Sequence, residues 1–427
     1  MKRRHQIVLF AVLLLSLTIL SPSFDFRGSQ YTQERNPEKD TYPGASSLSH
    51  ERRAPLDVTV SMSKEEFDSF HKLAEEVAAS RYIQVKLRNV ESEEYKKVLD
   101  QEFALGENGD IILLNSDDVQ YYAKKGYLVP LNGTALSKSL GDTIIELRGM
   151  TEWNGYQWGM PFDFDPYIMG ATASFLNKAD LQGLPQNKDQ WSKVIKVSQM
   201  EGLSLISMNI EDIFGASAWM GSLPLGMSPD QIITLQPTSL VNELQQGITL
   251  LNQLQPQIKT LSEDPVGFAS NVKMSTPMFV STLSRILQED EAAGDQRNQN
   301  RFVSDNLMEP LHAVESRSLV ITSGSVEADA ASRWIEGMLS ASTRKKWFDE
   351  TKRLSARKAE TKQVAEDSGI LYEKFKNQSW FSKDYDPVQT AKSREIVMRF
   401  EKQVKQFLRG QINAAQYVSS IRKATNR

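Results

Sequence analysis

The sequence predicts an α/β protein with two lobes, in which each lobe is a mainly parallel β-sheet flanked by helices. The chain has 427 residues, which is more than one ordinary domain holds. From residue 56 onward, short apolar strands alternate with amphipathic helices, the pattern of a parallel sheet with crossover helices. Hydrophobic residues make up 40% of the chain, so apolar material suffices for ordinary cores.

The N-terminus has the features of a secretion signal. Basic residues at 2–4 precede an apolar run at 7–20 and a small-residue segment that ends at Ser23. We predict that residues 1–23 are either a signal peptide or a retained N-terminal membrane anchor. In both cases the body lies outside the cytoplasm, secreted or tethered to the outer face of the cytoplasmic membrane. Residues 24–55 are polar and aperiodic, which predicts a disordered tether.

The composition excludes several kinds of chemistry. The chain has no cysteine, which rules out disulfides, a thiol nucleophile, thiolate metal sites and a lipid-bearing cysteine. Its four histidines show no HxxxH or HxH spacing, so we expect neither a metal site nor a cofactor. The net charge of −4, without a basic stripe, argues against a nucleic-acid partner.

Residues 56–126 are predicted to form three strand–helix units. Ser63 and Glu66 form a capping box at the start of the first helix, and each helix places apolar residues three or four positions apart. The run Ile111–Leu114 is continuously apolar, as in a strand buried on both faces. The expected strands cover 56–60, 83–87 and 111–114, and the expected helices cover 63–77, 95–103 and 116–126.

Residues 153–178 combine aromatic, acidic and turn residues. An Asn-Gly turn signal lies between Trp153 and Trp158, so we expect a hairpin whose aromatic side chains pack on the lobe. Asp163 and Asp165 follow, flanked by prolines.

The remaining chain continues the alternation of strands and helices. Trp334 has the spacing of a helix core residue. Residues 211–215 and Trp219 are expected in or beside a Gly-rich loop at 215–221, and residues 356–366 read as a loop. Strands are expected at 205–210, 272–274 and 319–321, and helices at 191–195, 240–251, 279–287, 331–339, 397–407 and 416–421.

This order of elements resembles the extracellular solute-binding proteins of ABC importers, and most closely family 1, which includes the maltose-binding proteins. GDIILLNSDDVQYYAKKGYLVPLN looks like the family's DI…YAxxGxLxPL segment, and WNGYQWGMPFDFDPYIMGATASFLNK is similar to its xNGKxYGxP…YNK segment. FLRGQINAAQYVSSIRK is similar to the closing helix pair. The likeness runs from Leu56 to Arg422. It departs from the pattern at Met278-Phe279, where the family usually has a Gly and a Trp.

The resemblance implies a periplasmic-binding-protein-like fold of type II, with two hinge-linked lobes that close over a solute. Such a protein performs no chemistry, binds a sugar or oligosaccharide and delivers it to ABC permease subunits, and we expect a monomer. The first crossing between the lobes is expected at 161–167. Lobe 1 is expected to comprise 56–162 and 312–362, and lobe 2 to comprise 163–311 and 363–427.

Sugar binding requires aromatic faces for stacking and acids or amides that accept hydroxyl hydrogen bonds. Asp163 and Asp165 lie on the expected hinge strand, where alternation puts them on the same side, followed by Tyr167. They are candidate ligands of adjacent hydroxyls or of a cation; the alternative is ion pairing with Lys or Arg across the hinge. Asn115 and Asp117 follow a parallel strand, where ligands collect, although they also suit helix capping.

Four further residues are candidate ligand contacts. Trp219 is the best stacking candidate of the second lobe, with packing as its alternative. Thr276 and Phe279 match a family turn that often carries a stacking aromatic residue. Lys64 matches a position that sometimes reaches the ligand, and a solvated charge is its alternative.

Two other functions compete with solute delivery. One is a secreted glycoside hydrolase that uses Asp163 and Asp165 as its paired carboxylates. The other is a membrane-anchored accessory or sensor protein that keeps the fold without a transport role. The missing lipid-bearing cysteine and the altered turn at 276–279 motivate the second alternative.

Overall fold

The computed structural model of the protein describes residues 54–131, 136, 139–210, 212–223, 240–261, 276–293, 308–368 and 394–425. The expected leader and nearly all of the expected tether lie outside these residues, so both stay predictions. The described residues all belong to one unit, Arg53–Arg427. Among them, no helix is both long and apolar enough to cross a membrane.

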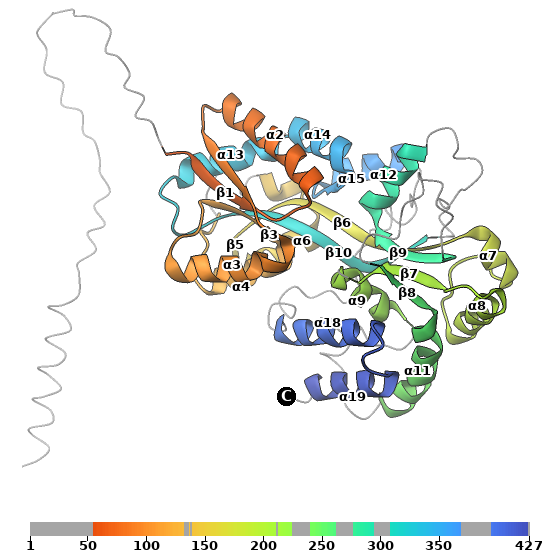
Figure 1. Ribbon diagram of the computed structural model, residues 1–427. Helices are drawn as coiled ribbons and strands as arrows, with labels where there is room; N and C mark the ends of the chain where they lie inside the picture. The colour runs from red at the N-terminus through yellow and green to blue at the C-terminus, as the bar shows by residue number, and fades with distance from the viewer. Residues whose placement is uncertain are drawn as a thin grey trace, which may run out of the picture. The chain divides into compact units, whose positions relative to one another are not determined.

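The three predicted strand–helix units are confirmed (Figure 1). The strands β1, β2 and β3 pair in parallel, with β1 in the middle. Helix α2 packs on one face of β3 through Ile111 and Leu113, and α3 and α4 pack on the other through Ile112 and Leu114. Ser63 caps α2 by accepting the backbone N–H of Glu66, as the capping box predicts. The bounds are β1 Leu56–Val60, α2 Lys64–Ser80, β2 Val85–Asn89, α3 Ser92–Leu105, β3 Ile111–Asn115 and α4 Ser116–Lys124.

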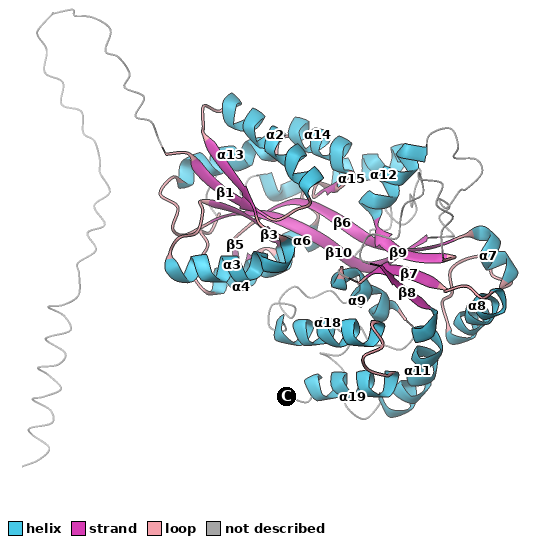
Figure 2. Ribbon diagram, in the orientation of Figure 1, coloured by secondary structure: helices cyan, strands magenta, loops and turns pink. Residues whose placement is uncertain are grey.

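Two long strands, β6 (Met160–Ala171) and β10 (Met308–Ile321), lie in the middle of the sheet. They connect a first part of the fold, built around β1, β2 and β3, to a second part, built around β7 (Ile206–Asn209), β8 (Ile258–Leu261) and β9 (Met278–Thr282). They pair with each other in antiparallel orientation, and their register shifts between Pro310 and Val314 and again between Arg317 and Ser318. Strand β10 also pairs with β3, and β6 pairs with β9, which is followed in the sheet by β7 and β8. The expected two sheets therefore form one continuous path, β2-β1-β3-β10-β6-β9-β7-β8 (Figure 2).

The second part repeats the parallel pattern with β9, β7 and β8. Helix α9 (Ile213–Ser222) follows β7, and α12 (Leu283–Ala293) follows β9. The C-terminal helices α18 (Arg394–Leu408) and α19 (Ala414–Thr425) pack into the same apolar core. The other bounds are α7 Ala173–Lys178, α8 Lys188–Glu201, β7 Ile206–Asn209, α11 Leu240–Leu254, η2 Gln255–Gln257, β8 Ile258–Leu261 and β9 Met278–Thr282.

Three local predictions are wrong. The helix expected from residue 279 begins at Leu283, because residues 278–282 instead form β9 against residues 167–171 of β6. The strand expected at 272–274 is not one of the three; it lies outside the described residues and stays a prediction. The loop expected at 215–221 lies within helix α9, and the loop expected at 356–366 is mostly helix α15 (Lys358–Ser368). Helix α9 buries apolar residues in the core of the second part, whereas α15 is rich in good helix formers and packs Val364 against an apolar cluster.

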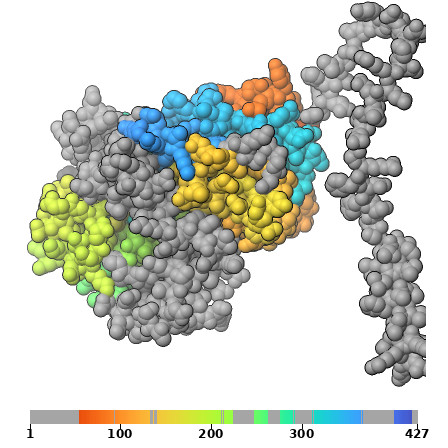
Figure 3. Space-filling view, turned by 180° about the vertical axis from the view of Figure 1, so that it is seen from behind, coloured from red at the N-terminus to blue at the C-terminus, as the bar shows by residue number. Residues whose placement is uncertain are grey.

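The Asn-Gly turn forms the predicted hairpin between β4 (Glu152–Trp153) and β5 (Tyr156–Gln157). Both turn residues have positive φ, as a two-residue hairpin loop requires. Trp153 and Trp158 pack on the core behind β3, which confirms the packing prediction. From behind, the yellow segment that contains this hairpin lies at the surface (Figure 3).

The buried apolar residues form separate clusters. One gathers around β1, α2, α13 (Ala328–Met338) and α14 (Ala341–Thr351), and includes Trp334 as predicted. Another gathers around α8, β7, α9 and the C-terminal helices. A third joins α12 to the short helix α6 (Ile145–Met150) and to β11 (Leu354–Ser355), a strand that pairs with β6. The predicted lobe boundaries stay predictions.

Candidate functional site

Asp163 lies fully buried in the middle of β6 and is surrounded by donors. Arg317 on β10 donates to it through Nε at 3.0 Å and through a second guanidinium nitrogen. The indole Nε1 of Trp347 donates to Oδ2 at 2.8 Å, and Arg353 Nε lies 3.2 Å from the same oxygen. This is the pairing with arginine that the sequence left open as the alternative to ligand binding.

Asp165 is also buried and ties β6 to the start of α12. The backbone N–H of Ser284 donates to its Oδ1 at 2.9 Å, and the Ser284 hydroxyl donates to its Oδ2 at 2.5 Å. Arg353 Nη1 lies 3.4 Å from Oδ2. Both aspartates contact Arg353, so they lie on the same side of β6, as alternation predicts.

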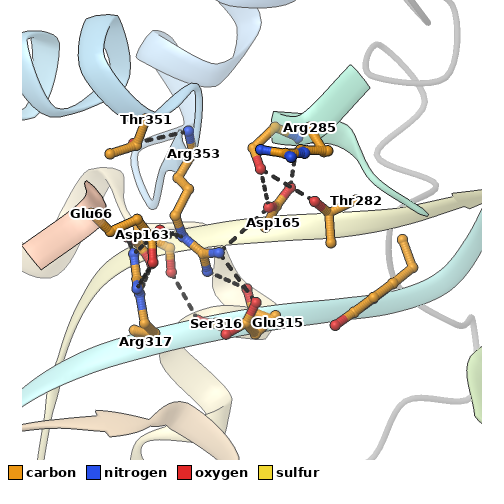
Figure 4. Close-up of polar contacts among 12 residues, drawn as sticks. Glu66, Asp163, Asp165, Thr282, Arg285, Glu315, Ser316, Arg317, Thr351 and Arg353 are labelled. Carbon is orange, nitrogen blue, oxygen red and sulfur yellow. Dashed lines mark hydrogen bonds and ion pairs between the residues drawn. The ribbon is translucent and has the colours of Figure 1, made fainter. Parts of the chain in front are cut away.

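Two more carboxylates complete the cluster (Figure 4). Glu66, from the first turn of α2, accepts from Arg317 at 3.3 Å and lies 3.9 Å from Arg353. Glu315 sits opposite Asp165 on β10 and pairs with Arg353 at 3.1 Å. Their side chains are 24% and 37% exposed, whereas both arginine side chains are 6% exposed. Four carboxylates therefore share two guanidinium groups, and only the two glutamates reach solvent.

The surroundings shift the pKa values of Asp163 and Asp165 in opposite directions. Burial raises the pKa of Asp163, but Arg317 and Arg353 outweigh it, so the pKa lies below the usual value. Burial raises the pKa of Asp165 to about 6, because Arg353 and Ser284 offset it only in part and Glu315 opposes ionisation. For Glu315, burial is outweighed by Arg353 and Arg317, and its pKa is lowered.

Tyr167 continues the same side of β6 toward α9. Its hydroxyl donates to Asp212 Oδ1 at 3.1 Å, and its ring lies 5.5 Å from that of Phe214. Asp212 also caps α9 by accepting the backbone N–H of Gly215 at 3.1 Å. Tyr167 is buried, whereas Asp212 and Phe214 are partly exposed. Tyr167 therefore joins the start of α9 to β6, the strand that carries both aspartates.

The predicted stacking residues lie in the core. Trp219 is buried against Trp191, with ring centroids 6.4 Å apart. Phe279 is buried over Gly170, and the buried Thr276 donates its hydroxyl to Ser207 at 2.7 Å. Contacts of this kind are typical of core packing, and a role of Trp219, Thr276 and Phe279 in solute binding stays a prediction.

The remaining candidates lie at the carboxyl ends of β1 and β3. Asn115 is partly buried and caps α4 by accepting the backbone N–H of Asp117 at 3.3 Å. Lys64 is exposed on the first turn of α2. The structure places these three residues in the first part of the fold, and Trp219, Thr276 and Phe279 in the second. Their contacts with a solute stay predictions.

Sequence reasoning missed the cations of the cluster. The sequence patterns single out neither Arg317 nor Arg353, and they mark Glu66 only as a capping residue. The alternation of β10 could have paired Arg317 with Asp163. Nothing local marks Arg353, because its partner Asp165 is 188 residues away. No group of three or more acidic or histidine side chains in the described part of the chain could hold a metal ion.

Residues 72–370 match the family model of the bacterial extracellular solute-binding proteins. The match spans well over half of the chain, so the protein belongs to this family, whose members are binding proteins that act outside the cytoplasm. The predicted resemblance and fold are confirmed.

Solved structures similar in fold include the GacH receptor of Streptomyces glaucescens, which was crystallised unliganded and with acarbose. It is 16% identical, with 87% of this chain and 98% of that chain covered and a TM-score of 0.64. Maltose-bound MalE3 of T. maritima is 15% identical, with 87% and 99% covered and a TM-score of 0.64. MalE of Xanthomonas citri is 14% identical, with 87% and 96% covered and a TM-score of 0.64. No curated protein matches the chain.

We predict that Arg353→Met destabilises the protein by about 3–5 kcal/mol, because it leaves buried carboxylates without their shared counter-ion. Urea unfolding followed by circular dichroism measures this change. Arg285→Met is the matched control, since Arg285 is exposed beside the cluster and its loss should change stability by less than about 0.5 kcal/mol. Equal effects of the two substitutions would contradict the prediction.

Asp165 predicts a pH dependence of stability. Its pKa is higher in the folded protein than its ordinary 3.8, so its contribution is fully present below about pH 4 and is lost as the pH rises through about 6. The shift corresponds to a cost on the order of 3 kcal/mol at neutral pH.

Relative to Asp165→Asn, the native protein should therefore lose stability between about pH 4 and pH 7.5, as urea unfolding at each pH would show. Asp349→Asn, on the exposed surface of α14, should instead follow the native curve. If the free energies of unfolding of Asp165→Asn and of the native protein differ by the same amount at every pH, the raised pKa of Asp165 is refuted.

Proposed function

We propose that this protein captures a carbohydrate outside the cytoplasm and delivers it to the permease of an ABC importer. The observation that carries the proposal is fold similarity over 87% of the chain to receptors crystallised with acarbose and with maltose. The family match supports a binding role in place of catalysis. We further propose that residues 1–23 act as leader or anchor, that 24–55 tether the body, and that the protein acts as a monomer.

We propose that the solute binds at a rim formed by Glu66, Asp212, Phe214 and Glu315. All four are partly exposed. Arg353 contacts the two glutamates, and Tyr167 of β6 contacts Asp212 and Phe214. The carboxylates would accept hydroxyl hydrogen bonds, and the Phe214 ring would cover an apolar sugar face. Asp163 and Asp165 would act behind this rim by holding the arginines in place, since both are buried.

The glycoside hydrolase alternative has little support. Asp163 is enclosed by two arginines and a tryptophan, and Asp165 by a serine and an arginine. A general acid or nucleophile must reach the glycosidic bond, and neither carboxylate reaches the surface.

A sensor role without transport is the second candidate, because all aromatic residues expected to stack on sugar are buried in the core. This alternative predicts that no sugar binds and that a protein partner is captured at the membrane.

The proposal predicts that at least one sugar among maltose, maltotriose, acarbose, tagatose and mannitol raises the melting temperature by mass action. Asp212→Asn should weaken binding of that sugar about 10-fold by calorimetry, because a charged acceptor becomes neutral while Asn still caps α9.

Asp189→Asn is the control, because Asp189 lies exposed in the first turn of α8 and should leave affinity unchanged. Binding that survives Asp212→Asn would contradict the proposed rim. Absence of binding across the panel would favour the sensor role, and hydrolysis of any glycoside would overturn both.

A further inference from the structure

The turn between α14 and β11 makes an unusual set of contacts. Lys352 has φ of 58°, a left-handed conformation that residues with a side chain rarely adopt. Its Nζ donates to the backbone oxygen of Asp349 at 3.0 Å and pairs with Glu291 of α12 at 2.8 Å. This conformation ends α14, where the Lys352 backbone N–H donates to the Phe348 backbone oxygen at 2.8 Å, and it leaves the Lys352 side chain in contact with α12.

The neighbours of Lys352 also bind the second part of the fold. The backbone oxygen of Thr351 accepts the Gln288 side-chain N–H at 2.8 Å, again from α12. Arg353 enters the buried carboxylate cluster, where it contacts Asp165, whose other partner is the first turn of α12. Three consecutive residues therefore reach α12 or the residue that anchors its start.

The other side of this turn is fixed to the first part of the fold. Helix α14 packs on α2, where Lys346 pairs with Glu76 at 2.6 Å. The ring of Trp347 lies 5.9 Å from that of Phe70. The turn thus bridges two helices that belong to different apolar clusters, α2 in one and α12 in another.

We propose that Thr351–Arg353 is a strap that holds α12 against α14 and limits how far the two parts of the fold separate when no solute is bound. Leu287 of α12 belongs to the same buried apolar cluster as Leu354 and Ala356, and burial of this cluster adds a non-directional attraction between the two segments. The polar contacts fix direction, because each requires a particular position of α12 relative to α14. The inference goes beyond the proposed function, since it concerns the solute-free protein and requires no particular ligand.

The Lys352–Glu291 pair offers the cleanest way to test the strap. The Lys352 side chain is 14% exposed, so its charge is partly shielded from solvent, whereas that of Glu291 is 66% exposed and can be replaced without disturbing the core. Reversing one charge turns attraction into repulsion at the same place. Reversing both restores attraction with the partners exchanged.

The chain has no cysteine, so two spin labels can be placed without competing sites. Tyr82→Cys labels the turn after α2, and Met200→Cys labels α8 on the other side of the crossing; both positions are exposed. Double electron–electron resonance on the full chain without solute then measures the distance distribution between the labels.

Glu291→Lys and Lys352→Glu should each shift the distribution to longer distances and broaden it, and the double reversal should return it to the native form. Lys345→Glu is the matched control, because Lys345 pairs only with Asp349 on its own helix in the described structure and should change nothing. Unchanged distributions for both single variants would overturn the strap, as would a double variant that fails to restore the native distribution. These outcomes are independent of whether any sugar binds, so they separate the strap from the proposed function.

Discussion

A single buried guanidinium shared by four carboxylates is the interaction on which the middle of this fold depends. Arg353 lies within 3.9 Å of Glu66, Asp163, Asp165 and Glu315. Ionised groups are tolerated away from water only when they are paired, so removing one member leaves the others with an uncompensated desolvation cost. The four acids come from a helix and from both long strands, and one side chain thereby fixes three elements relative to one another.

The cluster lies where the strands are least regular. The register of β6 with β10 shifts on each side of a short block, in which Asp163 faces Arg317 and Asp165 faces Glu315. Irregular pairing bends strands and re-aims side chains. The structure thus combines a locally bent pair of strands with a charged centre that resists separation. A binding protein whose parts move relative to each other needs both properties at the crossing.

Much of the fold could be predicted because it depends on sequence patterns a few residues long. The capping box at Ser63, the buried run Ile111–Leu114 and the Asn-Gly hairpin all specify structure within a few residues. The site was less predictable, because its chemistry depends on residues far apart in sequence. The sequence makes Asp163 and Asp165 candidate ligand-binding residues, because it does not show that Arg353 lies beside both of them. Trp219 is a candidate stacking residue in the sequence, whereas in the structure it lies on α9 and is buried in the core.

Asp163 and Arg353 act as one structural unit, and a double-mutant cycle on the free energy of unfolding measures their coupling. Asp163→Asn and Arg353→Met should each destabilise the protein, while the double variant loses less than the sum, with a coupling of at least about 1 kcal/mol. Losses that add to within about 0.5 kcal/mol would show that the two side chains act independently and do not form one unit.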